Sequence, residues 1–230
     1  MPARSYHHGD LRAALLEAGA LELAERGAEQ FSLRGVAKRA AVSHAAPAHH
    51  FGGKAGLLTA LAERGFLAFA EGIEAAAPGE KSAALLGSAP EAGGESGQRS
   101  AAGSALIAAG RAYVDFALAH PKLFALMFSS SWPDFERPEL DRSSARAFDA
   151  FVSFVELAYT GLGLSQDELH LRAMANWSAV HGLALLLLEG RMRSVLMMSV
   201  AERDSAVRRI LELSAGIPLE SAAPRIAGPG

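Results

Sequence analysis

The sequence predicts an all-α protein, and three observations support this prediction. Apolar residues recur at intervals of three and four along most of the 230 residues, the spacing that places them on one face of a helix. No stretch alternates apolar and polar residues between turn residues, as a half-buried strand would. Glycine and proline fall between the periodic stretches, where they begin or end helices.

Composition excludes several classes of protein. Half of the residues are hydrophobic and 20% are charged, which is enough to build a core, and there is no cysteine. Disulfide frameworks, thiolate metal sites and cysteine nucleophiles are therefore excluded. The polar N-terminus has no signal-peptide pattern, and the longest apolar run, residues 183–188, is far shorter than the roughly 20 residues of a spanning helix. We expect a soluble, cytoplasmic protein outside the membrane.

Two helices are predicted at the start of the chain. The apolar stripe from Leu11 to Leu23 predicts the first helix, and Gly27 stands where that helix would end. Ser32 is a suitable N-cap for the second helix, because its hydroxyl can accept a backbone N–H of the first turn. This second helix, over residues 33–40, is short and needs support from its neighbours.

A third short helix is predicted after a tight turn at residues 41–42. Ser43 is its expected N-cap, the helix covers residues 44–51, and two glycines end it. Pro47 removes an intrahelical hydrogen bond and disfavours helical geometry at the residue before it, so we expect an irregular first turn. A fourth helix begins near Lys54 and runs to about residue 75.

Two short helices joined by a tight turn and braced by a longer one form a helix-turn-helix, whose second helix enters the major groove of DNA. The outward face of that helix must then be small or polar, while hydroxyl, imidazole and ammonium groups at helix ends can hold phosphate oxygens. The predicted base-facing residues are His44, Ala45, Ala48 and His49. The predicted phosphate contacts are Ser32, Ser43, His50 and Lys54, and Arg34 and Pro47 complete the predicted DNA-binding set.

The charge distribution supports a DNA-binding domain, although purely structural interpretations of the histidines and of Lys54 stay open. Residues 1–66 hold eight Lys and Arg against six Asp and Glu, whereas the rest of the chain has a net charge of −5. The histidines could instead be ordinary surface residues, and Lys54 could be a solvated lysine. A metal site is not expected, because the histidine spacing is not i, i+4 and no thiol is present.

These residues carry a resemblance to a known family. The motif consists of Phe31-Ser32-Leu33-Arg34, Val36-Ala37, Ala40 and Val42-Ser43, followed by His50-Phe51, Lys54 and Leu57-Leu58. It resembles the DNA-binding domain of the tetracycline-repressor (TetR) family of bacterial transcriptional regulators, and the resemblance covers residues 6–66. It implies a domain of residues 1–54 that binds double-stranded DNA, and it implies a phosphate contact for Lys54. Two residues depart from the family pattern: Ala41 replaces the usual glycine and Ala48 the usual tyrosine.

The rest of the chain predicts a larger helical-bundle domain over residues 55–216. Its helices are expected at residues 105–120, 122–128, 138–159, 166–189 and 201–215. Residues 75–105 are rich in Ala, Gly, Ser and Pro and predict a mobile loop within this domain. Residues 217–230 contain three prolines and predict a flexible tail.

Aromatic residues concentrate in this second domain, eleven of the sixteen between Tyr113 and Trp177. Small-molecule sites are mainly apolar and aromatic, so this concentration predicts a ligand pocket. Its expected lining is Tyr113, Phe116, Phe124, Met127, Phe128, Trp132, Phe148, Phe151, Trp177 and His181. The sequence Trp177 to Gly182 also resembles the TetR-type C-terminal domain named for its Trp, His and Gly residues. His181 could equally be a buried histidine with no ligand.

The last two long helices are candidates for a dimer interface. Residues 183–188 are apolar on every side, which a helix at a monomer surface does not tolerate. The resemblance implies that these helices pair with their two-fold mates in a four-helix interface. The predicted interface residues are Leu183, Leu187, Val207, Ile210 and Leu211.

Together these features predict a homodimeric transcriptional regulator that binds a palindromic operator and is released by a small apolar or aromatic effector. No cofactor is expected, and no catalytic constellation supports an enzyme. Two alternatives stay open at this point. One is an all-helical carrier or small-molecule enzyme, and the other is a regulator without a ligand, whose cavity is filled by its own aromatic side chains.

Overall fold

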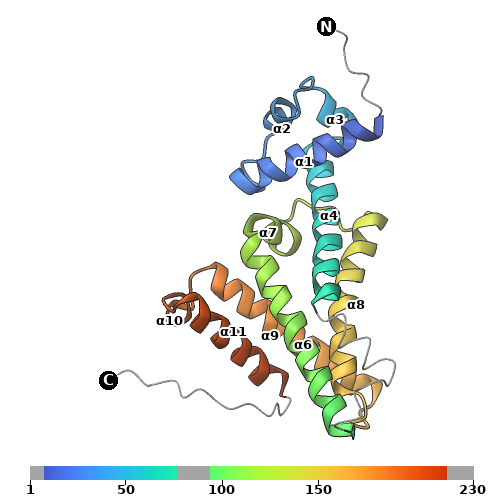
Figure 1. Ribbon diagram of the computed structural model, residues 1–230. Helices are drawn as coiled ribbons and strands as arrows, with labels where there is room; N and C mark the ends of the chain where they lie inside the picture. The colour runs from blue at the N-terminus through green and yellow to red at the C-terminus, as the bar shows by residue number, and fades with distance from the viewer. Residues whose placement is uncertain (1–7, 77–93, 217–230) are drawn as a thin grey trace. The chain divides into compact units, whose positions relative to one another are not determined.

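The computed structural model describes residues 8–76 and 94–216 (Figure 1). Every regular element within these residues is a helix, which confirms the predicted fold class. The predicted tail from residue 217 and part of the predicted loop, residues 77–93, lie outside the described residues.

The chain divides into two compact units. The first contains the residues up to Ile73 together with Tyr113–Ala150, and the second contains Glu74–Ala112 together with the chain from Phe151 onward. Three helices, α4 (Lys54–Ala75), α6 (Gly94–Ala119) and α8 (Pro138–Tyr159), run from one unit into the other. The unit that holds the N-terminal helices therefore also contains residues 113–150.

Three short or medium helices precede α4 in the first unit. They are α1 (His8–Arg26), α2 (Leu33–Arg39) and α3 (Ala46–Phe51), with α2 and α3 beside α1 near the start of α4 (Figure 1). The helix α1 ends as predicted: Gly27 has a φ of 69°, and its N–H donates to the carbonyl of Leu23 at 2.8 Å. The first unit also contains α7 (Pro121–Ser129), which packs against α1.

A buried carboxylate joins α1 to α2. The side chain of Glu22 is 2% exposed, and one of its oxygens accepts a hydrogen bond from Arg39 Nε at 2.9 Å. Arg39 also pairs with Glu25, and hydrogen bonds to Glu25 and Glu22 raise the pKa of Arg39. Gly35 lies directly against Glu22, since a Cβ atom there would be 2.3 Å from Oε1. The two helices thus approach closely around this carboxylate.

The predicted start of α6, the helix that follows the loop after α4, was wrong. The helix α6 begins at Gly94, so residues 94–105, which we expected in a loop, are helical. Ala102 and Ala105 are buried, and Gly110 lies where a Cβ atom would be 3.2 Å from Leu211 on the last helix. Small residues here permit close packing of a helix, whereas the same composition without its tertiary contacts is typical of a flexible stretch.

Unit 2 is completed by α9 (Gln166–Leu188), α10 (Arg193–Leu196) and α11 (Val200–Ala215), with α9 packed against α11. The helix α10 was not predicted. Ser199 forms a capping box with Glu202 at the start of α11, and these hydrogen bonds lower the pKa of Glu202. The hydroxyl of Tyr159, at the end of α8, donates to the carbonyl of Ala215 and ties the end of α11 to α8.

Candidate nucleic-acid interface

The turn between α2 and α3 uses left-handed backbone geometry. Ala41 has a φ of 54°, the one positive φ of a non-glycine residue in the described chain. This geometry lets the N–H of Val42 donate to the carbonyl of Ala37 at 3.0 Å. It costs alanine roughly 1–2 kcal/mol, because its Cβ approaches a backbone carbonyl oxygen. The turn therefore forms without the expected glycine, at the cost of local strain.

The helix α3 is shorter than predicted. It begins at Ala46 rather than residue 44, and its N-cap is Ala45, with no side-chain hydrogen bond. The prediction that Ser43 caps it was wrong, because Ser43 contributes its backbone carbonyl, which accepts the N–H of Ala46 at 3.0 Å. Pro47 stands in the first turn, where its missing N–H has no intrahelical partner to lose. The predicted irregular first turn is not observed, because the helix begins later than expected: Ala45 has right-handed geometry, and the N–H of His49 donates to its carbonyl at 3.0 Å.

The outward face of α3 is small and polar, as a helix in the major groove requires. Ala48 and His49 on α3 are exposed, and so are His44 and Ala45, which immediately precede the helix. Pro47 is buried together with Phe51, so it packs behind α3, and its predicted place in the interface does not hold in this conformation. Among the candidates of this stretch, Pro47 alone is buried.

The predicted phosphate contacts have different surroundings. Ser32 caps α2, where its hydroxyl accepts the N–H of Gly35 at 3.3 Å. Arg34 and Ser43 are exposed, and His50 is half-exposed beside the ring of His49. Arg39 is held by its two glutamates, as described above, so Arg34 is the better placed arginine on α2.

Lys54, at the start of α4, contacts Trp132, a residue that the sequence analysis placed in the ligand pocket. Its ammonium donates to the carbonyl oxygen of Glu29 at 3.0 Å and lies 4.1 Å from the centroid of the Trp132 ring. The indole N–H of Trp132 donates to the Glu29 carboxylate at 3.1 Å. We expected Trp132 in a ligand pocket, but it lies against the start of α4. A spacing of 103 residues between Glu29 and Trp132 leaves no sequence signal for this contact.

The ten residues of the predicted ligand pocket are divided between the two units. The first seven belong to unit 1, and Phe151, Trp177 and His181 belong to unit 2. In unit 1 the aromatic rings pack on one another and on two phenylalanines of α4 that were not predicted, Phe66 and Phe69. Ring centroids in this cluster are 4.7–6.4 Å apart. Tyr113 and Phe124 are fully buried, so these rings form core.

Trp177 and His181 share a face of α9, as their spacing predicted. Their rings stack with centroids 5.4 Å apart and an interplanar angle of 27°. Burial lowers the pKa of His181 from its usual value. The imidazole is therefore biased toward its neutral form, which suits a partly buried stacked ring.

A cleft of about 390 Å³ opens in unit 1 between α1, α4 and the corner where α6 meets α7. Ala20, Leu61, Gly65 and Phe116 contribute apolar lining. Phe116 is the single residue of the predicted pocket that lines this cleft. The polar side chains that line the cleft are Arg64, His120 and Lys122. Arg64 forms an ion pair with Glu17. An apolar molecule with an acidic group would match this lining.

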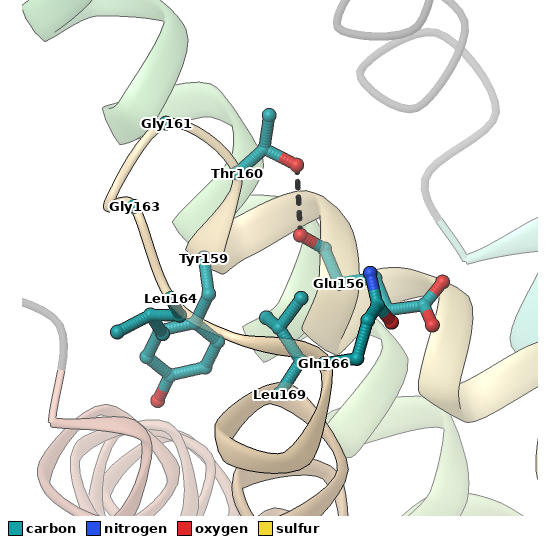
Figure 2. A pocket seen from close by; sticks show the side chains of 8 residues that line it. All are labelled: Glu156, Tyr159, Thr160, Gly161, Gly163, Leu164, Gln166 and Leu169. Carbon is teal, nitrogen blue, oxygen red and sulfur yellow. Dashed lines mark hydrogen bonds between the residues drawn. The ribbon is translucent and has the colours of Figure 1, made fainter.

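A second cavity, of about 490 Å³, lies at the turn between α8 and α9 in unit 2 (Figure 2). Tyr159, Leu164 and Leu169 line it together with glycines of the turn. The hydroxyl of Thr160 donates to the carbonyl of Glu156 at 2.8 Å, as the dashed line in Figure 2 shows. The cavity is open to solvent.

Most residues of the predicted dimer interface face inward. Leu183, Leu187, Val207 and Leu211 are 3–5% exposed, so they pack within the protomer, and Ile210 is half-buried. Their assignment to a dimer interface was wrong for this reason: the apolar stripe that periodicity detects is the one that α9 and α11 bury inside their own chain.

Other apolar residues of these helices remain exposed. Leu171 and Leu186 on α9 are 62% and 46% exposed, and Leu213 on α11 is 66% exposed. Among the described residues, α9 is the one helix long and apolar enough to cross a membrane, and only 33% of its apolar window is buried. A single helix of this kind is weak evidence for a membrane span, because a core helix can have the same length and composition.

Comparison with known families assigns both parts of the chain. Residues 15–61 match the family of bacterial regulatory proteins called the tetR family, and residues 106–213 match the tetracyclin repressor-like C-terminal domain. The first match contains α2, α3 and the start of α4, the elements that build the interface described above. A search of curated proteins finds no match.

Solved structures agree with this assignment. A protein of unknown function from Rhodococcus sp. RHA1 is 29% identical, with a TM-score of 0.66 over 92% of this chain and 98% of its own. PfmR, a TetR-family transcriptional regulator from Thermus thermophilus, is 18% identical, with a TM-score of 0.56 over 88% and 97%. A TetR-like transcriptional regulator from Rhodococcus sp. RHA1 is 17% identical, with a TM-score of 0.54 over 92% and 96%. The helix-turn-helix, the all-helical body and the two family matches lead to one conclusion: this chain belongs to the TetR family of bacterial transcriptional regulators.

Proposed function

We propose that this protein is a dimeric repressor that binds a palindromic operator through α3 and leaves it when a small molecule binds. The observation that carries the proposal is the exposed face of α3. Ala45, Ala48 and His49 leave room for base edges, while Phe51 and Pro47 are buried behind them. A two-fold dimer would place two such helices in successive major grooves, about one helical turn or slightly more apart.

The test of DNA binding uses fluorescence anisotropy with labelled duplexes. The fragment upstream of the protein's own gene is compared with a random duplex of equal length over a range of salt concentrations. We expect tighter binding to the upstream fragment. His49→Ala should change base preference, whereas Lys54→Ala should weaken binding to both duplexes alike and lower the salt slope by about one for each Lys54 in the complex. Equal losses on both duplexes for both variants would contradict this division of roles.

Dimerisation is proposed through the exposed faces of α9 and α11. These faces carry Leu171, Leu186 and Leu213, which are large apolar side chains left open to solvent in the protomer. A second copy that covers them would form the four-helix interface of an isologous dimer. Light scattering at micromolar concentration should give twice the chain mass of 24.0 kDa. If the measured mass is that of a single chain, the proposed dimer is wrong.

The effector is proposed to be a small apolar acid that enters the cleft between α1, α4 and the α6–α7 corner. The apolar lining around Leu61 and Phe116 would cover its body, and Lys122 would attract its acidic group. Arg64 would bind the same group by exchanging it for its present partner, Glu17. Such a ligand releases DNA only if it binds more tightly to a conformation that DNA does not favour. Arg64→Gln should then weaken release of the operator by an aromatic carboxylate such as benzoate or salicylate, without change in operator affinity.

One observation favours a second candidate, a regulator that responds to no small molecule. The aromatic side chains expected to line a pocket fill unit 1 with their own contacts, and Tyr113 is 0% exposed. Operator binding that persists in the presence of a broad panel of apolar acids and neutral aromatic compounds would favour this candidate.

A further inference from the structure

Trp132 joins three parts of unit 1 that lie far apart in the sequence. Its indole ring lies beneath the Lys54 ammonium at the start of α4, with 4.1 Å between the nitrogen and the ring centroid. Its ring N–H donates to the carboxylate of Glu29, in the turn between α1 and α2, at 3.1 Å. Glu29 in turn accepts the Lys54 ammonium at 3.0 Å, through its backbone carbonyl and not its carboxylate.

We propose that Trp132 is a positioning residue for DNA binding: its ring supports the Lys54 ammonium, and its N–H holds the Glu29 carboxylate away from that ammonium. The positive charge then remains free to meet a DNA phosphate. This inference rests on the proposed function, because it requires Lys54 to be a phosphate contact.

The chemistry of the three groups explains the arrangement. A lysine ammonium has three N–H donors and a long flexible stem, so an unsupported Lys54 would sample many positions. The face of an indole attracts a cation without neutralising it. The Glu29 carboxylate would neutralise the ammonium if the two paired, and a hydrogen bond from the indole N–H gives that carboxylate another partner.

The chain around Trp132 is itself fixed to α4. The N–H of Asp134 donates to the hydroxyl of Thr59 at 3.1 Å, and that hydroxyl donates to the carbonyl of Ala55 at 2.8 Å. One residue further on, the ring of Phe135 lies against Phe66 of α4, with centroids 6.3 Å apart. The segment between α7 and α8 is thus anchored to α4 at two successive residues, and it sets where the indole stands.

The test removes the N–H of Trp132 and keeps an aromatic face. In Trp132→Phe, the Glu29 carboxylate loses its partner and can pair with Lys54. We expect the affinity for both the upstream fragment and a random duplex to fall by about fivefold at low salt, with a shallower salt slope. The double variant Trp132→Phe with Glu29→Gln should recover most of the lost affinity, because the amide carries no charge. Glu29→Gln alone, which removes one negative charge beside the duplex, sets the affinity with which the double variant is compared.

Other outcomes separate this inference from the proposed function. Unchanged affinity in Trp132→Phe, or a loss that Glu29→Gln does not recover, overturns the positioning role while DNA binding stands. If Lys54→Ala leaves DNA affinity unchanged, Lys54 is no phosphate contact and the inference fails. If the wild-type protein binds neither duplex, the proposed function fails first.

A second measurement covers the case in which Trp132→Phe unfolds. The chain has two tryptophans and therefore two indole N–H resonances in an NMR spectrum. Glu29→Gln should shift one of them, the one that hydrogen-bonds to residue 29, and addition of a duplex should shift the same resonance. If neither indole N–H resonance changes its chemical shift in Glu29→Gln, the inference is overturned.

Discussion

Ala41 forms the turn between two helices in a backbone conformation that is strained for alanine. The backbone between α2 and α3 needs a positive φ, and Ala41 supplies it at 54°. Alanine is unfavourable in this left-handed conformation, so a substitution at residue 41 can increase the stability of the protein.

Ala41→Gly should stabilise the protein by about 1 kcal/mol, because glycine reaches the left-handed region without the Cβ contact. Urea denaturation at neutral pH measures the change as a higher midpoint with an unchanged slope. Ala40→Gly is the matched control: Ala40 has a right-handed φ of −77°, so glycine there should lower the midpoint. A lower midpoint for Ala41→Gly would show that the turn is unstrained.

His181 predicts a pH dependence of stability. Burial lowers its pKa below the usual 6.5, so the unfolded chain binds the proton at a higher pH than the folded chain does. The free energy of unfolding should therefore fall as the pH drops through about 6.5, and this contribution should level off below the pKa of the folded state. His181→Gln should lose less stability than the wild type between about pH 7.5 and pH 5.5 in urea titrations. Parallel pH curves for the two proteins would contradict the shift.

At the scale of single elements, local sequence signals were mostly correct. The end of α1 at Gly27 and the cap of α2 by Ser32 follow from backbone geometry and hydrogen bonds within a few residues. The errors are also local. Ser43 lies before α3 and does not cap it, and residues 94–105 belong to α6 rather than to a loop.

The connection between α3 and α4 depends on a glycine that cannot be replaced without a large loss of stability. A Cβ atom on Gly56 would lie 1.8 Å from the carbonyl oxygen of Phe51, which is backbone and cannot move aside. Gly56→Ala should destabilise the protein by about 3 kcal/mol, because the turn must open to admit the methyl group. The expected readout is a lower melting temperature together with weaker DNA binding.

Gly72→Ala is the control within the same helix. Gly72 is exposed in α4, and nothing lies within 4 Å of its added Cβ. This substitution should raise stability by up to about 1 kcal/mol, as expected for alanine in place of glycine on a helix surface. Equal effects of the two substitutions would mean that the contact at Gly56 is not rigid.

At the scale of the whole molecule, the structure redistributes the chain between its two units. The sequence led us to place a boundary near residue 54 and to treat α4 as the connection. The described residues form two compact units, and α7 and parts of α6 and α8 belong to the same unit as the helix-turn-helix. A ligand in the cleft of unit 1 would therefore contact α1 itself, together with α4.

The oligomeric state can be tested at the exposed leucines. Leu186→Glu combined with Leu213→Glu should give a monomer in light scattering, because two charges would be buried in the proposed interface at a high cost in free energy. The helical content measured by circular dichroism should not change, since both side chains are exposed in the protomer. A dimer of unchanged affinity would place the interface elsewhere.

The sequence by itself determined the all-helical class, the helix-turn-helix and the family. All of these rest on periodicity, caps and spacings that act over a few residues. Tertiary structure alone decided that Trp132 meets Lys54 and Glu29 and that Leu183 and Val207 pack inward. It also decided that the predicted pocket residues divide between two units. The physical reason is that periodicity identifies which face of a helix is apolar or aromatic. Which residues pack against that face depends on contacts between residues as far apart in the chain as 29 and 132.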